Sequence, residues 1–161
     1  MEKENNYITL QTGEVLIGYP NETLVSGPLG SCVAVIMYDT QKRYGGMAHI
    51  MLPYANNREE KDHRYAHDAI LYLIELMNKQ SESLEYVRVC LVGGANVLYD
   101  HDDSLCTNII SSVLKILSEN KLTIIKKSLG GFLRRQLILE VNSGKVFCSV
   151  GDDKEALFYQ F

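Results

Sequence analysis

Tryptophan is absent from this chain, proline occurs only three times, and no CxxC pair joins any of the four cysteines. Without CxxC pairs or other zinc-like spacing, the cysteines do not predict a metal site. The N-terminal segment, Met1 to Asn6, is charged and polar with no apolar segment behind it, so we expect neither a secretory signal nor a disulfide framework.

Long hydrophobic runs are also missing, because no stretch approaches the about 20 apolar residues that span a bilayer. The net charge of −4 is mild and gives little reason to expect nucleic acid as the main partner. We therefore expect a cytoplasmic protein with no membrane insertion and no nucleic-acid partner.

What is present is the composition of an ordinary globular protein, with 161 residues, 46% hydrophobic and 22% charged. This length predicts one domain over residues 1–161, with a core from about residue 7 to 150 and a C-terminal tail over 151–161. The tail carries large apolar residues that suggest docking onto the body or a partner: Leu157, Phe158, Tyr159 and Phe161.

Hydrophobic periodicity predicts the order of the elements. Three- and four-residue apolar spacing predicts helices over 63–79 and from 103 or 104 to about 120. Apolar, β-branched runs predict strands over 23–25, 33–38, 44–52, 87–92, 122–127, 137–141 and 145–150, with one or two more within 7–17. The polar stretch 53–63 predicts an exposed loop. This order indicates an α+β (mixed α/β) protein with two helices covering one face of a sheet.

A cysteine and a histidine point to chemistry. Cys32 ends the glycine-rich turn Ser26-Gly-Pro-Leu-Gly-Ser-Cys32, and His49 follows in the next predicted strand. A thiol and an imidazole are the two parts of a cysteine nucleophile. If Thr40 and Gln41 form the turn between the two strands, Cys32 lies directly opposite His49, with Cβ atoms about 5 Å apart. A different loop length would change that register.

The other cysteines and histidines have simpler interpretations. Cys90 and Cys148 lie in predicted strands and read as small core residues, and Cys106, at the start of a helical pattern, receives little functional weight. His63 and His67 have the i, i+4 spacing of metal ligands, but no third ligand is evident. An exposed helix face explains them better, so we expect no metal.

These motifs resemble the chemoreceptor glutamine deamidase family, CheD. The resemblance rests on Leu29-Gly-Ser-Cys-Val-Ala-Val35 and Gly46-Met-Ala-His-Ile-Met-Leu-Pro53. Further matches are Arg64-Tyr-Ala66, Gly93-Gly-Ala95 and Gly130-Gly131 with Arg135. The resemblance runs from about Tyr7 to Val150 and implies a three-layer α/β/β sandwich. It also implies hydrolysis of glutamine side chains on methyl-accepting chemotaxis receptors to glutamate, without a cofactor.

The resemblance implies a Cys-His-Thr triad, carried here by Cys32, His49 and Ser26, with serine in place of the threonine. The serine hydroxyl would accept a hydrogen bond from the imidazole. Two further departures from the family lie at Leu105-Cys-Thr-Asn108 and Phe132-Leu-Arg134. A CheC-type phosphatase of the response regulator is implied as a partner besides the receptor.

The predicted reaction is amide hydrolysis through a Cys32 thioester, with the oxyanion held by backbone N–H groups near Gly30. Two other functions stay open at this stage. One is a weakly active or inactive module that binds receptor or phosphatase, because the two altered segments change the cleft. The other is a cysteine hydrolase, even a peptidase, that acts on a different amide.

Overall fold

The computed structural model describes residues 4–54 and 59–161, so part of the predicted loop 53–63 and the first three residues lie outside the described residues. Within these residues, five strands precede the first of two α-helices, one strand lies between the helices, and four strands follow the second. In order they are β1 (Asn6–Thr9), β2 (Val15–Gly18), β3 (Glu22–Val25), β4 (Val33–Asp39), β5 (Tyr44–Ile50), α1 (Ala66–Asn78), a short 3₁₀ turn (Leu84–Tyr86), β6 (Val87–Gly93), α2 (Ser104–Glu119), β7 (Thr123–Leu129), β8 (Arg135–Glu140), β9 (Lys145–Val150) and β10 (Ala156–Gln160).

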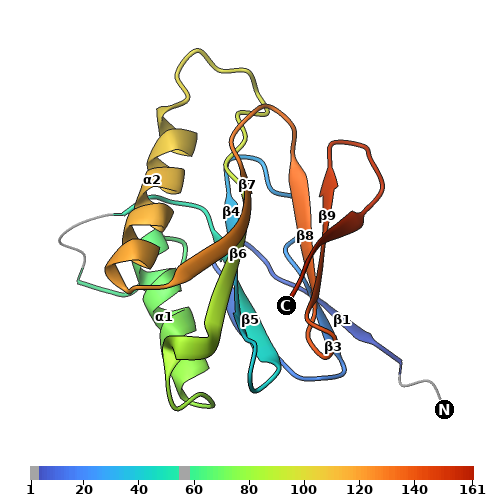
Figure 1. Cartoon of the computed structure of the whole chain (residues 1–161). Coiled ribbons are helices and arrows are strands. Elements are labelled where there is room, and N and C mark those ends of the chain that lie inside the picture. Colours follow the sequence, from blue (N-terminus) through green and yellow to red (C-terminus); the bar gives the residue numbers. More distant parts are fainter. Residues whose placement is uncertain (1–3, 55–58) are drawn as a thin grey trace.

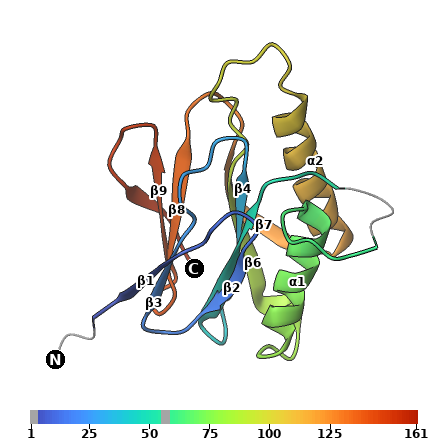
Figure 2. The ribbon, with the colours of Figure 1, turned by 180° about the vertical axis from the view of Figure 1, so that it is seen from behind.

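The strands form two five-stranded sheets, with orders β2-β5-β4-β6-β7 and β1-β3-β8-β9-β10. Helices α1 and α2 cover one face of the first sheet, and the second sheet lies against its other face (Figures 1 and 2). The result is the predicted α+β architecture in three layers. Among the described residues, no helix is long and apolar enough to cross a membrane.

The sequence of the central strand β4 is an almost continuous apolar run, and burial on both faces of the sheet explains it. Every residue of β4 is buried because the strand has a layer on each side. Side chains alternate between the faces, so Val33, Val35 and Met37 pack under the helices. Ala34, Ile36 and Tyr38 instead pack between the sheets.

The predicted tail contains a strand that periodicity did not predict. β10 pairs antiparallel with β9, and a register shift interrupts the pairing between Leu157 and Tyr159. Beyond it, the Phe161 ring stacks on Tyr38 with centroids 4.7 Å apart. The tail therefore docks onto the body of the protein.

Helix α1 begins three residues later than predicted. The backbone N–H groups of Met51 and Leu52 both donate to the Arg64 carbonyl, at 3.0 and 2.8 Å. Tyr65 forms an isolated parallel bridge with Leu52. This pairing holds the backbone before Ala66 out of the helix.

Candidate active site

Cys32 lies directly before β4, and its backbone is fixed by a glycine loop. The Cys32 carbonyl accepts a hydrogen bond from Gly94 N–H at 2.9 Å, and the Gly30 carbonyl accepts one from Ala95 N–H at 2.8 Å. Gly93 comes so close that a Cβ there would lie 2.1 Å from the Cys32 carbonyl oxygen. The half-buried thiol packs against the core between the sheets.

His49 lies on β5, next to β4, where it pairs with Ala34. Paired residues point to the same face, and so do residues two apart in one strand. Cys32 and His49 thus occupy the same face of the sheet, toward the second sheet. They are diagonal neighbours, a position whose Cα separation is about 7–8 Å and which long side chains can bridge.

The predicted register, with Cys32 directly opposite His49, is wrong. The hairpin has a four-residue loop, because Asp39 pairs with Tyr44 and not with Lys42. The Asp39 carboxylate accepts hydrogen bonds from the N–H groups of Gln41 and Lys42 at 2.9 and 2.8 Å, and Arg43 adopts a φ of 59°. The longer loop shifts the pairing by two residues, which leaves both side chains on one face.

The imidazole of His49 is held by backbone groups that lie directly after β1 and β3, two strands of the second sheet. Its Nδ1 lies 3.4 Å from the Leu10 carbonyl oxygen, and a further backbone hydrogen bond links it to Ser26. The Leu10 carbonyl can only accept, so the ring hydrogen lies on Nδ1. Nε2 is buried and has no hydrogen-bond partner in the described part of the chain. This tautomer leaves Nε2 with a lone pair that can take a proton.

Ser26 is fully buried, and its hydroxyl serves the backbone. The hydroxyl donates to the Gly27 carbonyl at 2.6 Å and accepts from the Leu137 N–H at 3.0 Å. The predicted bond from the imidazole to this hydroxyl is not among the hydrogen bonds of the described residues. Ser26 contacts His49 through its main chain instead.

Burial sets the protonation states of the pair. Desolvation raises the pKa of the Cys32 thiol, and Cys106 raises it further. Desolvation also lowers the pKa of His49, against the hydrogen bonds to Leu10 and Ser26 and the charge of Glu14, which raise it. Both shifts favour the uncharged forms, so the resting pair is a thiol beside a neutral imidazole.

Cys106, to which we assigned little functional weight from its sequence position, raises the pKa of the Cys32 thiol in the structure. It lies in the first turn of α2, one turn before Ile110, whose Cδ1 would be 2.6 Å from a Cβ on Gly94. Gly94 in turn donates to the Cys32 carbonyl. The i, i+4 spacing of Cys106 and Ile110 is the sequence signal for this position of Cys106, because it places both side chains on the same helix face.

The segment that links β7 to β8 is hydrogen-bonded both to the turn that carries Cys32 and to the glycines at the end of β6. Leu29 and Arg135 exchange backbone hydrogen bonds of 2.7 and 3.0 Å. The Gly130 N–H donates to the Gly93 carbonyl at 2.9 Å, and the Arg135 guanidinium donates to the Gly130 carbonyl at 2.7 Å. The predicted family positions 93–95, 130–131 and 135 therefore build the walls around Cys32.

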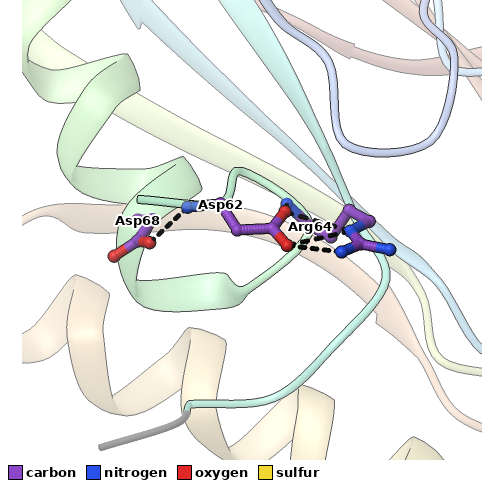
Figure 3. A network of polar contacts seen from close by, with 3 residues as sticks. All are labelled: Asp62, Arg64 and Asp68. Carbon is purple, nitrogen blue, oxygen red and sulfur yellow. Dashed lines mark hydrogen bonds and ion pairs between the residues drawn. The ribbon is translucent and has the colours of Figure 1, made fainter. Parts of the chain in front are cut away.

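The segment after His49 is fixed by an ionic network at the start of α1 (Figure 3). The Arg64 guanidinium pairs with the Asp62 carboxylate at 2.6 Å, and the Asp62 N–H donates to Asp68 at 2.7 Å. Since the Arg64 carbonyl accepts from Met51 and Leu52, this network anchors the chain directly beyond His49.

The two histidines of the predicted helix are engaged in other contacts. His63 stacks on Tyr72 with ring centroids 4.3 Å apart, and His67 lies edge-on to Tyr54 at 5.2 Å. The described residues contain no group of three side chains suited to hold a metal ion.

Comparison with known proteins agrees with the sequence resemblance. The family model described as CheD chemotactic sensory transduction matches residues 51–150. A Chlorobium luteolum protein named probable chemoreceptor glutamine deamidase CheD is 34% identical, over 98% of this chain and 80% of its own length.

Two other relatives carry the same name or its unqualified form. A Clostridium novyi protein named probable chemoreceptor glutamine deamidase CheD is 31% identical over 86% of this chain and 90% of its own. The Thermotoga maritima protein named chemoreceptor glutamine deamidase CheD is 28% identical, over 83% of this chain and 85% of its own length.

Proposed function

The chain belongs to the CheD family, and from this premise we propose that it hydrolyses glutamine side chains of chemotaxis receptors to glutamate, with Cys32 as nucleophile and His49 as general base. The observation that carries this proposal is the placement of both side chains on one face of adjacent strands. The His49 Nδ1 is hydrogen-bonded to the Leu10 carbonyl, and Nε2, which has no partner in the described part of the chain, remains to accept a proton.

The chemistry follows from these protonation states. His49 accepts the proton of the Cys32 thiol as sulfur attacks the carboxamide carbon, because the thiolate is the reactive form. The backbone N–H of Cys32 and one other near Gly30 would hold the oxyanion, each worth about 3 kcal/mol. The imidazolium then gives its proton to the departing ammonia. Water hydrolyses the thioester to glutamate and restores the thiol.

In this proposal the Ser26 hydroxyl does not act as the third member of a catalytic triad. Its backbone and that of Leu10 orient the imidazole. The serine hydroxyl keeps the turn in place through Leu137. This explains how serine can replace threonine at this position without loss of the contact to His49.

The proposed partners follow from the family. The proposed substrate is the cytoplasmic part of a methyl-accepting chemotaxis receptor, and we propose the cytoplasm as the place where the protein acts. A CheC-type phosphatase of the response regulator is the second proposed partner.

The direct test is mass spectrometry of receptor cytoplasmic domains after incubation with the protein. We expect intact receptor with the mass increase that replaces an amide NH₂ by OH at defined glutamines, together with ammonia release. Receptor fragments would instead show a peptidase, and binding without any mass change would show an inactive module. Receptor incubated alone is the control for spontaneous deamidation.

The pH dependence of thiol reactivity tests the resting state of the pair. Because burial raises the pKa of Cys32, its alkylation by iodoacetamide should be slow at about pH 7 and rise through and above the ordinary thiol pKa of about 8.5. The lowered pKa of His49 means that no imidazolium stabilises a thiolate at neutral pH. Alkylation is measured by mass spectrometry at Cys32 across a pH series. A rate that is already maximal below about pH 7 would contradict a neutral pair.

Replacing Ser26 with alanine separates the two roles of this residue. The Leu137 N–H loses its buried acceptor, so we expect a loss of about 1–3 kcal/mol in unfolding free energy. Activity should fall less than about tenfold, because the backbone contact to His49 remains. Urea unfolding and ammonia release measure the two effects, and Ser26→Thr, which keeps the hydroxyl, is the control. Loss of activity by about 1,000-fold without loss of stability would show that the hydroxyl acts on the imidazole.

A further inference from the structure

An exposed apolar surface lies on the loops that surround Cys32. Its members are large apolar side chains, each more than half exposed: Leu98 (78%), Tyr99 (67%), Phe132 (54%) and Leu133 (54%). We call these four residues the apolar rim. Exposed clusters of large apolar side chains are uncommon and mark interaction surfaces.

The rim is one surface, although its residues come from two distant loops. The rings of Tyr99 and Phe132 stack in parallel, with centroids 5.0 Å apart and planes 4° apart. The Asn96 N–H donates to the Gly131 carbonyl at 2.9 Å, which joins the backbones of the two loops. Figure 1 shows both loops, after β6 and after β7, at the same end of the molecule.

The rim is continuous with the proposed active site. Within the first loop, Gly94 donates to the Cys32 carbonyl, and Val97 lies 3.2 Å from the position of a Cβ on Gly30. Directly after the second loop, Arg135, the first residue of β8, pairs with Leu29 in the turn that carries Cys32. The loops that carry the rim are therefore the ones bound directly to the turn that carries Cys32.

The first loop is held in a fixed and costly conformation. Tyr99 has a φ of 55°, which is uncommon for a bulky residue. The Asn96 side chain closes the loop on either side of Tyr99: its amide donates to the Asp100 carbonyl at 2.8 Å and accepts from the Asp100 N–H at 3.1 Å. Such strain persists only where the surroundings impose it and is concentrated at functional sites. The loop therefore presents Leu98 and Tyr99 to solvent in a defined position.

We infer that the apolar rim binds apolar side chains that flank the target glutamine in the receptor, and so selects which glutamine reaches Cys32. This inference rests on the proposed function. A glutamine of a macromolecule enters the site together with its neighbours, and those neighbours meet the surface next to Cys32. The rim offers them rigid aromatic area without charge, so residues of matching apolar character gain most from the contact.

The test is a double variant, Tyr99→Asn with Phe132→Ser, and the single variant Leu98→Ser. Asparagine is chosen because it tolerates positive φ and leaves the loop unstrained. The matched control is Tyr19→Asn, which removes an equally exposed tyrosine (64%) from the β2–β3 loop. Deamidation kinetics are measured on a receptor cytoplasmic domain and on a short glutamine peptide without apolar neighbours. Alkylation of Cys32 reports the integrity of the site without any receptor.

We expect kcat/KM on the receptor to fall about 10- to 100-fold in the double variant, mainly through KM, and by a smaller factor in Leu98→Ser. The short peptide, the alkylation rate and the Tyr19→Asn control should stay unchanged.

Two results would overturn the inference while the proposed function stands: unchanged receptor kinetics in the rim variants, or an equal loss on receptor and short peptide. If the wild-type protein leaves the receptor unmodified, the proposed function fails and the inference falls with it.

Discussion

Replacing Cys32 with alanine should abolish receptor deamidation, with kcat lowered by at least about 1,000-fold. Cys90, whose thiol lies on the same face of the sheet, should not take over, because it is fully buried and desolvation raises its pKa to about 12, whereas Cys32 is only half-buried. The fold should be retained, since the cysteine backbone makes the hydrogen bond to Gly94 and alanine keeps that backbone. Ammonia release and the mass of the receptor measure the loss, and circular dichroism checks the fold.

Cys106→Ala is the matched control for this prediction. Cys106 is the thiol that contributes to the raised pKa of Cys32, yet it lies on α2 and not on the strand face that carries His49. We expect its removal to leave activity within about threefold. If the Cys32 variant kept its turnover while the Cys106 variant lost it, the nucleophile would have to be reassigned.

Replacing Gly93 with alanine should destabilise the protein by about 3–5 kcal/mol and remove activity together with stability. Its φ of 127° disfavours any side chain, and the added Cβ would lie 2.1 Å from the Cys32 carbonyl oxygen and 3.0 Å from the Val33 Cα. Both neighbours are backbone atoms of the strand that carries the nucleophile, so β4 or β6 must shift. Urea unfolding gives the stability change, and Cys32 alkylation reports the distortion of the site.

Gly130→Ala provides the comparison, because the two glycines share a positive φ but differ in free space. Gly130 has a φ of 77°, and an added Cβ meets nothing within 4 Å. Only the backbone strain remains, and it costs about 1–2 kcal/mol. Equal losses in both variants would mean that conformation alone, and not the close approach to Cys32, makes Gly93 necessary.

Local pattern was enough to predict most of the secondary structure. The apolar spacing of Ile109, Val113, Ile116 and Leu117 on α2 reflects one buried helix face, and the continuous run of β4 reflects burial on both faces. β10 was not predicted, because its five residues are broken by a register shift and are only partly buried. A short edge strand is determined by its partner, β9, more than by its own sequence.

The proposed reactive pair, Cys32 and His49, was visible in the sequence, because a cysteine after a glycine turn and a histidine in a predicted strand close behind it are local features. Their relation in space was not. Asp39 caps the N–H groups of Gln41 and Lys42, which lengthens the hairpin loop and shifts the pairing. Only the fold shows that His49 is held by the backbones of Leu10 and Ser26, which lie directly after β1 and β3 of the other sheet.

The amino-acid order by itself indicated which residues we propose for the chemistry and determined which segments become helix or strand, since both depend on neighbours within a few positions. The tertiary structure alone decided how the imidazole is oriented, which second thiol lies near the first, and that Tyr99 and Phe132 share one surface. Those outcomes arise from contacts between residues far apart in the chain, and such contacts exist only after the two sheets and the helices have packed.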